Sequence, residues 1–237
     1  MGFWNSIFPI IREADVLLIL ADARMPELSR NIELEDIVRR HHKPFFIVYT
    51  KIDLISKEEL NKLMNNYPDA FFISGLKNKG LSTLRRELMI ERKRMKVETI
   101  RVGIFGYPNV GKSSLINCFA RGARTQVSSI AGTTKGPQFV RVGSIKIIDS
   151  PGVIPYSDKE SNLGLIAAKN PEKLRNPDRV AHKIINILKP NEDSYEIFLA
   201  FGKKRGFLKK GGEVDERKTA LFIVQHWQRG DLRAEAF

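Results

Sequence analysis

The stretch Gly106-Tyr107-Pro108-Asn109-Val110-Gly111-Lys112-Ser113 fits the pattern GxxxxGK[ST] and stands between two segments of different character. Residues 99–105 form an apolar run typical of a buried strand, and residues 114–120 have the pattern of a helix start. Glycines let backbone N–H groups turn inward around phosphate oxygens, and a helix N-terminus adds a favourable dipole. The stretch therefore predicts a phosphate-binding loop in which Lys112 reaches the β- and γ-phosphates and the Ser113 hydroxyl binds Mg²⁺.

Apolar runs and amphipathic segments alternate on both sides of this loop. We expect helices at about 3–11, 31–41, 56–65 and 79–95, and strands at about 15–21, 44–49, 70–73, 99–105, 139–142 and 144–149. Such alternation predicts an α/β fold, a mostly parallel sheet with helices on both faces. Ligands then bind at the carboxyl ends of the strands. Residues 121–136 lack periodicity, and we expect a mobile loop there.

The segment Thr50-Lys51-Ile52-Asp53 follows the strand at 44–49 directly. An aspartate there can accept hydrogen bonds from guanine N1–H and N2–H₂, which adenine does not offer in that arrangement, and such a difference gives large discrimination. Lys51 would lay its alkyl stem over the base plane. Alone, these four residues fit a helix N-cap equally well, but the preceding strand and the phosphate loop favour a guanine pocket.

The segment Asp149-Ser150-Pro151-Gly152 fits DxxG and follows the strand at 144–149. We expect Asp149 to hold Mg²⁺ through water and the Gly152 N–H to meet the γ-phosphate; the plainer alternative is a Pro-Gly turn. Within the expected mobile loop, we favour Thr134 over Thr133 as the threonine that completes the Mg²⁺ coordination when a triphosphate is bound.

Composition narrows the class of protein. The 237 residues carry a formal net charge of +13, which favours a polyanionic partner without separating RNA, DNA or mere solubility. The single cysteine, Cys118, excludes an internal disulfide framework, and the four histidines have neither metal-site nor catalytic-triad spacing. No apolar run approaches the roughly 20 residues of a membrane span, and we see no secretory signal. We therefore expect a cytoplasmic protein.

The pattern changes after Gly152, where strands give way to helical segments at 162–169, 171–188 and 216–228. We expect two domains: an α/β domain over residues 1–153 and a small helical domain over residues 154–237. The basic clusters at 92–96, 203–205 and 209–210 are candidate RNA contacts, although each could equally be a solvated face.

In chain order the motifs are TKID, SGL, GYPNVGKS, GTT and DSPG, an order that resembles the circularly permuted GTPases of the YlqF/YawG type. Residues 22–31 also resemble that family's DARxP…SRN segment, and residues 205–215 resemble its RGxL…GGExD segment. The resemblance covers nearly the whole chain. One departure is Thr50, where many members have Asn.

The resemblance implies a circularly permuted GTPase that hydrolyses GTP to GDP and phosphate slowly, with Mg²⁺ and with stimulation by K⁺. It further implies a factor in assembly of the large ribosomal subunit, stimulated by the ribosomal particle. The expected partners are that subunit or its precursor and rRNA, with no DNA, no membrane and a monomeric state. One alternative is a regulatory GTP-binding module that acts on a protein partner with little turnover. Another is a regulatory GTPase with a protein or membrane partner.

The resemblance also implies roles for single residues. Ser74 and Gly75 would close the base pocket, Asn109 would bind K⁺, and Val153 replaces the water-positioning glutamine of Ras-like enzymes. The predicted catalytic residues are Lys112, Asn109, Thr134 and Gly152. The predicted nucleotide-binding residues are Thr50, Lys51, Asp53, Ser74, Gly75, Leu76, Gly106, Asn109, Val110, Gly111, Lys112, Ser113, Ser114 and Gly152. The predicted metal ligands are Ser113, Thr134 and Asp149 for Mg²⁺ and Asn109 for K⁺.

Overall fold

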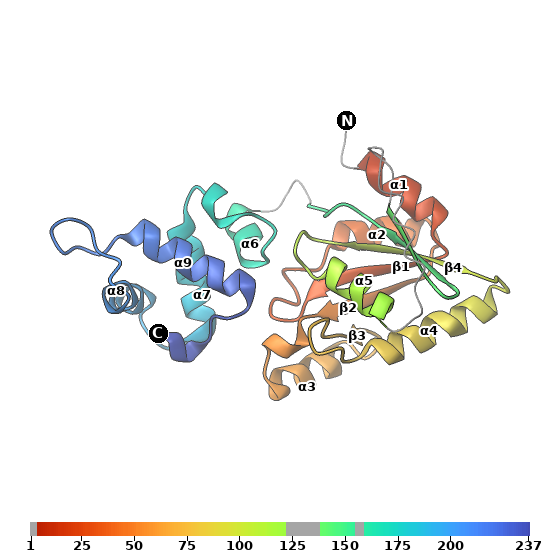
Figure 1. The fold of residues 1–237 in the computed structure, drawn as a ribbon, viewed down its shortest axis with the longest axis horizontal. Coiled ribbons are helices and arrows are strands. Elements are labelled where there is room, and N and C mark those ends of the chain that lie inside the picture. Colours follow the sequence, from red (N-terminus) through yellow and green to blue (C-terminus); the bar gives the residue numbers. More distant parts are fainter. Residues whose placement is uncertain (1–3, 122–137, 155–158) are drawn as a thin grey trace. The chain divides into compact units, whose positions relative to one another are not determined.

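The computed structural model describes residues 4–121, 138–154 and 159–237. These fall into two compact units, Met1–Pro155 and Tyr156–Phe237 (Figure 1). Within the described ranges, no helix is long and apolar enough to cross a membrane.

The first unit is built on a six-stranded sheet in the order β3-β2-β1-β4-β6-β5. Its strands are β1 (Val16–Asp22), β2 (Phe45–Thr50), β3 (Phe71–Phe72), β4 (Ile100–Gly106), β5 (Gln138–Val142) and β6 (Ile145–Asp149). Only β5 runs antiparallel to its neighbour; all other pairs are parallel. This confirms the predicted fold class. The helices of this unit are α1 (Trp4–Glu13), α2 (Ile32–Arg40), α3 (Lys57–Asn66), α4 (Leu81–Arg94) and α5 (Lys112–Arg121).

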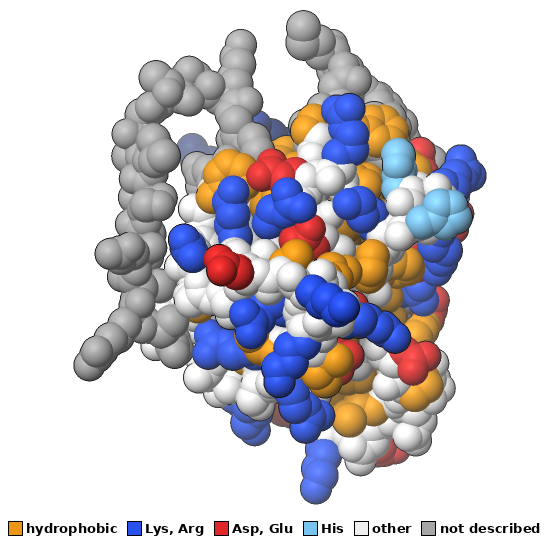
Figure 2. Space-filling view, turned by 90° about the vertical axis from the view of Figure 1, so that its right-hand side faces the viewer, with side chains coloured by type: hydrophobic (Ala, Val, Ile, Leu, Met, Phe, Trp, Pro, Cys, Tyr) orange, Lys and Arg blue, Asp and Glu red, His pale blue; other side chains and the backbone are white. Residues whose placement is uncertain are grey.

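Strand register brings the ends of the parallel strands to common edges. Asp22 at the end of β1 lies opposite Thr50 at the end of β2, and Leu20 lies opposite Gly106 of β4. We call this side, where β1, β2, β4 and β6 end, the carboxyl edge. The loops that carry the predicted motifs leave from it. The opposite side, where the parallel strands begin, is the amino edge, and it faces the viewer in Figure 2.

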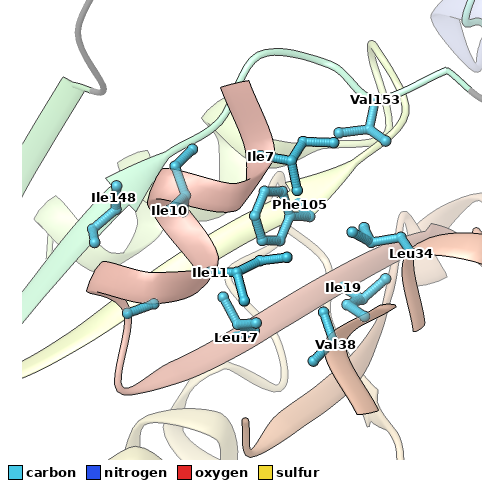
Figure 3. Close-up of a cluster of buried hydrophobic side chains, with 11 residues drawn as sticks. Ile7, Ile10, Ile11, Leu17, Ile19, Leu34, Val38, Phe105, Ile148 and Val153 are labelled. Atoms are coloured by element: carbon cyan, nitrogen blue, oxygen red, sulfur yellow. The ribbon is translucent and has the colours of Figure 1, made fainter. Parts of the chain in front are cut away.

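Helix α1 covers one face of the sheet with an apolar side. Ile7 and Ile11 of α1 pack with Leu17 of β1 and Phe105 of β4 in one buried cluster (Figure 3). Each fully buried aliphatic or aromatic side chain of this kind contributes about 1.5–3 kcal/mol to folding. Val153, just after the DSPG segment, belongs to the same cluster and has no exposed surface. The cluster thus connects the sheet to the residue that follows a predicted site motif.

The second unit is helical. Its helices are α6 (Glu160–Leu165), α7 (Pro177–Leu188), α8 (Ser194–Lys204) and α9 (Glu216–Arg229), with 3₁₀ turns at Pro171–Lys173 and Ala234–Ala236. Asp215 caps the start of α9 by accepting a hydrogen bond from Lys218 N, and Gly230 ends the helix in a left-handed conformation. Buried Trp227 of α9 donates through Nε1 to Leu165 O at 2.8 Å. These contacts hold α9 against α6.

Two features of this unit differ from the sequence-based expectation. The segment expected as one helix over 171–188 is split, because Pro177 disfavours helical backbone at Asn176. Helix α8 was not predicted. It begins at the N-cap Asp193 and buries Phe198, Phe201 and Gly202, an apolar stripe too short to stand out as a period.

Candidate functional site

The phosphate loop connects β4 to α5 and is anchored by buried Tyr107 and Val110. Gly111 adopts φ +116°, and a Cβ there would lie 3.3 Å from the Thr50 side chain, so a larger residue would be both strained and crowded. Lys112 folds back over the loop, and its Nζ donates to Gly106 O at 3.0 Å and Tyr107 O at 2.9 Å. The loop is therefore compact, with the lysine ammonium held at its centre.

Asp149 and Lys112 influence each other across the carboxyl edge. Burial raises the pKa of Asp149, and Lys112 opposes this rise only in part. Burial likewise lowers the pKa of Lys112 against the attraction of Asp149. The buried Oδ1 of Asp149 accepts no hydrogen bond from any residue that the structure describes. A buried carboxylate oxygen without a donor costs free energy, so this atom fits a hydrated cation at the loop.

The residues predicted to form the base pocket lie in contact with one another. The Ser74 hydroxyl donates to Asp53 Oδ1 and accepts from Lys77 N at 3.0 Å, which fixes the carboxylate. A Cβ on Gly75 would lie only 2.8 Å from Ser114 Cβ, so the loop after β3 packs closely on the first turn of α5. The structure therefore brings the TKID, SGL and phosphate-loop segments together. Leu76, in contrast, is 80% exposed.

Thr50 is buried between the end of β1 and the phosphate loop. Its hydroxyl lies within hydrogen-bond distance of Val110 O in the phosphate loop and of Ala21 O, the latter at 3.1 Å. The side chain is 4% exposed. This arrangement indicates that Thr50 supports the phosphate loop.

Lys51 belongs to a buried ion cluster whose role the sequence did not reveal. Asp22 Oδ2 accepts from both Lys51 Nζ and Arg24 Nη2, each at 2.8 Å. Burial alone would raise the pKa of Asp22. The hydrogen bonds and positive charges of Arg24 and Lys51 together outweigh burial, so the pKa is lowered. For Lys51, burial outweighs the attraction of Asp22 and lowers the pKa. Asp22 thus fixes the direction of the Lys51 side chain. The available signals were the DARxP resemblance and the place of Asp22 at a strand end.

The DSPG segment lies against the phosphate loop. Val153 N donates to Gly106 O at 3.1 Å, and a Cβ on Gly152 would lie 2.7 Å from Pro108 Cγ. The Val153 side chain points into the core (Figure 3), so this position offers no side chain to the site. Asn109 is exposed at the loop, and Thr133 and Thr134 lie outside the described residues.

Comparisons with known proteins agree with this geometry. Residues 101–206 match a family described as 50S ribosome-binding GTPase. The chain is 37% identical over 239 residues to the uncharacterized GTP-binding protein MJ1464 of Methanocaldococcus jannaschii, covering 94% of this chain and 64% of that protein. It is 31% identical over 255 residues to nucleolar GTP-binding protein 2 of Pneumocystis carinii, covering 97% of this chain and 52% of that protein. The chain thus spans only part of these relatives.

Among solved structures, GNP-bound YlqF from T. maritima matches with a TM-score of 0.69 at 22% identity, over 98% of this chain and 95% of that one. This match shows a shared fold. The order of the motifs along the chain, the strand order and these matches make the chain similar to the circularly permuted GTPases of the YlqF/YawG type.

Proposed function

We propose that this chain binds GTP and hydrolyses it to GDP and phosphate. The observation that carries the proposal is the meeting, at one edge of the sheet, of the phosphate loop, the Asp53–Ser74 pair and the carboxylate of Asp149. A base reader, a phosphate cradle and a cation-seeking carboxylate are the three parts that guanine-nucleotide hydrolysis requires.

Each part has a distinct task. Asp53 selects guanine. The phosphate-loop N–H groups and Lys112 hold the β- and γ-phosphates. To reach them, the Lys112 ammonium would give up its hydrogen bonds to Gly106 O and Tyr107 O. Ser113 and Asp149 are the proposed Mg²⁺ ligands, with Thr134 as a further predicted ligand. Mg²⁺ held there would neutralise the negative charge of the β- and γ-phosphates. We assign K⁺ to Asn109, where a monovalent cation stabilises transition-state charge.

We further propose that turnover is slow in isolation and is stimulated by the large ribosomal subunit or its precursor, through contacts with rRNA. Burial of Val153 supports slow turnover, because no side chain at this position can orient water. The match to a family described as 50S ribosome-binding GTPase and the similarity to a nucleolar GTP-binding protein support a ribosomal partner. In the second unit, Lys203–Arg205 and Lys209–Lys210 are exposed next to the Leu208–Val214 bridge, where they are accessible to RNA. We place this activity where ribosomal subunits assemble, which is the cytoplasm in a cell without a nucleus.

The burial of Val153 also favours a second candidate function, a regulatory GTP-binding module that acts on a protein partner with little turnover. The two candidates differ in whether a ribosomal particle accelerates hydrolysis.

The test is phosphate release from GTP in KCl buffer while purified large subunits are titrated in, with small subunits and a Lys112→Ala variant as controls. We expect saturable stimulation by large subunits, no stimulation by small ones, and slower turnover when Na⁺ replaces K⁺. Tight GTP binding without stimulation by large subunits would contradict the assembly function and favour the regulatory module.

A further inference from the structure

Four segments form one face at the amino edge of the first unit: residues 12–15, 39–44, 93–99 and 141–144. Lys43 Nζ donates to Arg12 O at 3.2 Å and Ala14 O at 2.7 Å, which ties the first two segments together. Ile100 N donates to Ser144 O at 2.9 Å, which ties the last two. The geometry of this amino-edge face is thus set by hydrogen bonds to backbone carbonyls, from the Lys43 side chain in the first case and from a backbone N–H in the second.

Exposed cations are spread over all parts of this face. None of the following makes an ion pair with a residue that the structure describes: Arg12, Arg40, Lys93, Lys96 and Arg141. Figure 2 shows that Lys and Arg side chains cover much of this side, with fewer Asp and Glu among them. Lys93 and Lys96 come from the basic cluster at 92–96, and the fold brings Arg12, Arg40 and Arg141 to the same face.

Most acidic side chains on the face are already engaged by cations. Asp15 pairs with Arg101 at 2.6 Å, Glu13 pairs with Lys146 at 3.6 Å, and Glu91 pairs with Arg94 at 3.1 Å. Glu98 is the exposed carboxylate without such a partner among the described residues. The unpaired cations therefore leave an excess of positive charge.

Helix dipoles account for only part of this excess. Helices α1, α2 and α4 end at this face, and each helix C-terminus carries about half a negative charge, which favours nearby Arg and Lys. Three such ends amount to roughly one and a half charges, fewer than the unpaired cations present. Lys96 and Arg141 also lie outside the helices. Helix stabilisation alone does not explain the whole set.

We propose that the amino-edge face binds the phosphate backbone of double-helical RNA. Proteins that hold single strands offer exposed aromatic rings for stacking. Among the described residues of the first unit, the strongly exposed large hydrophobic side chains are Ile32, Met64, Leu76 and Ile90, none of them aromatic. The exposed rings on this face are the imidazoles of His41 and His42, and a cationic surface without exposed Phe, Tyr or Trp suits recognition by shape and phosphate contacts.

This face lies at the other end of the strands from the nucleotide site. A seven-residue strand such as β1 is about 20 Å long at about 3.3 Å per residue, so bound RNA leaves the carboxyl edge open. The choice of RNA as the polyanion rests on the proposed function, whereas the cationic face does not.

The experiment measures binding of the full chain to a fluorescent RNA stem of about 20 base pairs, longer than the roughly 16 base pairs that a double-stranded RNA domain spans. The face variant combines Arg12→Glu, Arg40→Glu, Lys93→Glu and Lys96→Glu. The control combines Lys57→Glu, Lys62→Glu, Lys173→Glu and Arg179→Glu, which change net charge equally at exposed sites elsewhere. Thermal unfolding and binding of a fluorescent GDP report whether each variant is folded.

For the face variant, we expect weaker binding and a plot of log K against log salt that is flatter by about 3.6, at about 0.9 for each of the four lost phosphate contacts. The control should keep most of the wild-type slope. Equal losses in both variants, or wild-type binding by a folded face variant, would overturn the proposal. So would loss of binding to phosphatidylserine vesicles with RNA binding unchanged.

The outcome is separable from the proposed function. RNA binding that survives in the face variant, beside stimulation by large subunits, would overturn only this surface. Loss of RNA binding in the face variant, without stimulation of the wild type, would uphold the surface and overturn the assembly function.

Discussion

The two edges of the sheet differ in whether their charged side chains are buried or exposed. At the carboxyl edge, Asp22 and Lys51 are withdrawn from water, and Asp149 keeps a buried oxygen without a donor. At the amino edge, Asp15 pairs with the half-exposed Arg101, and further cations face solvent unpaired. A buried charge lowers stability unless an opposite charge or a hydrogen-bond donor or acceptor compensates it, so such groups indicate a site that binds a ligand. Exposed cations cost little and mark a surface.

The largest contrast should come from the aspartates of the two edges. Asp22→Ala leaves Arg24 and Lys51 without their shared partner and should lower the free energy of unfolding by about 3–5 kcal/mol. Asp15→Ala removes a more exposed pair and should cost about 1 kcal/mol or less. Urea unfolding of both variants measures the difference, and similar losses would erase the distinction between the edges.

The second largest contrast should be the effect on GTP turnover of replacing a lysine at each edge. Lys112→Ala removes the ammonium held in the phosphate loop and should lower GTP turnover about 10²–10³-fold, the usual cost of losing a preorganised donor. Lys96→Ala, on the amino edge, should leave basal turnover unchanged. Steady-state phosphate release decides the matter, and a Lys112 variant with wild-type turnover would place the phosphates elsewhere.

Substitutions of Val153 test whether its side chain acts in the hydrophobic core or at the nucleotide site. Because its side chain is buried, Val153→Gln should place an amide in the core and lower the free energy of unfolding by about 1–3 kcal/mol without raising turnover. The matched variant Val153→Ala should also destabilise by leaving a cavity. Faster hydrolysis by the glutamine variant would show that this side chain does reach the nucleotide.

The smallest effect concerns pH, and its sign differs between the edges. The pKa of Asp149 is raised, so the folded state binds its proton more tightly, and stability should fall as pH rises from the unfolded pKa to the folded one. The pKa of Asp15 is lowered because the Arg101 hydrogen bonds outweigh burial, so its stabilisation should be lost as pH falls below about 3.9.

Replacing each aspartate in the nucleotide-free protein should therefore have opposite results near pH 7. Asp149→Asn should raise the Tm, at about 2–4 °C per kcal/mol, whereas Asp15→Asn should lower it. Calorimetry over a pH series checks both signs, and a lowered Tm for Asp149→Asn would show that the carboxylate is already satisfied.

Local pattern predicted the strands, most helices and the motif-bearing loops, because apolar periodicity and glycine spacing are written in neighbouring residues. Contacts between distant residues escaped it. Asp22 and Lys51 are 29 positions apart, and nothing in either segment says that one holds the other. The inward direction of Val153 depends on a backbone bond to Gly106. The basic cluster at 92–96 indicated one part of the amino-edge face, but no local pattern connects the cations of the other three segments to it.

We propose above that the carboxyl edge recognises guanine through the Asp53 carboxylate. This is tested by measuring how well guanosine, adenosine and xanthosine diphosphates compete for binding to the wild-type protein and to the Asp53→Asn variant. Xanthine carries an oxygen where guanine has its 2-amino group, and asparagine supplies the donor that this oxygen needs. We predict a guanine preference of at least about 100-fold in the wild type and a shift toward xanthine in the variant. Equal binding of adenine by the wild type, or an unchanged guanine preference in the variant, would contradict the account.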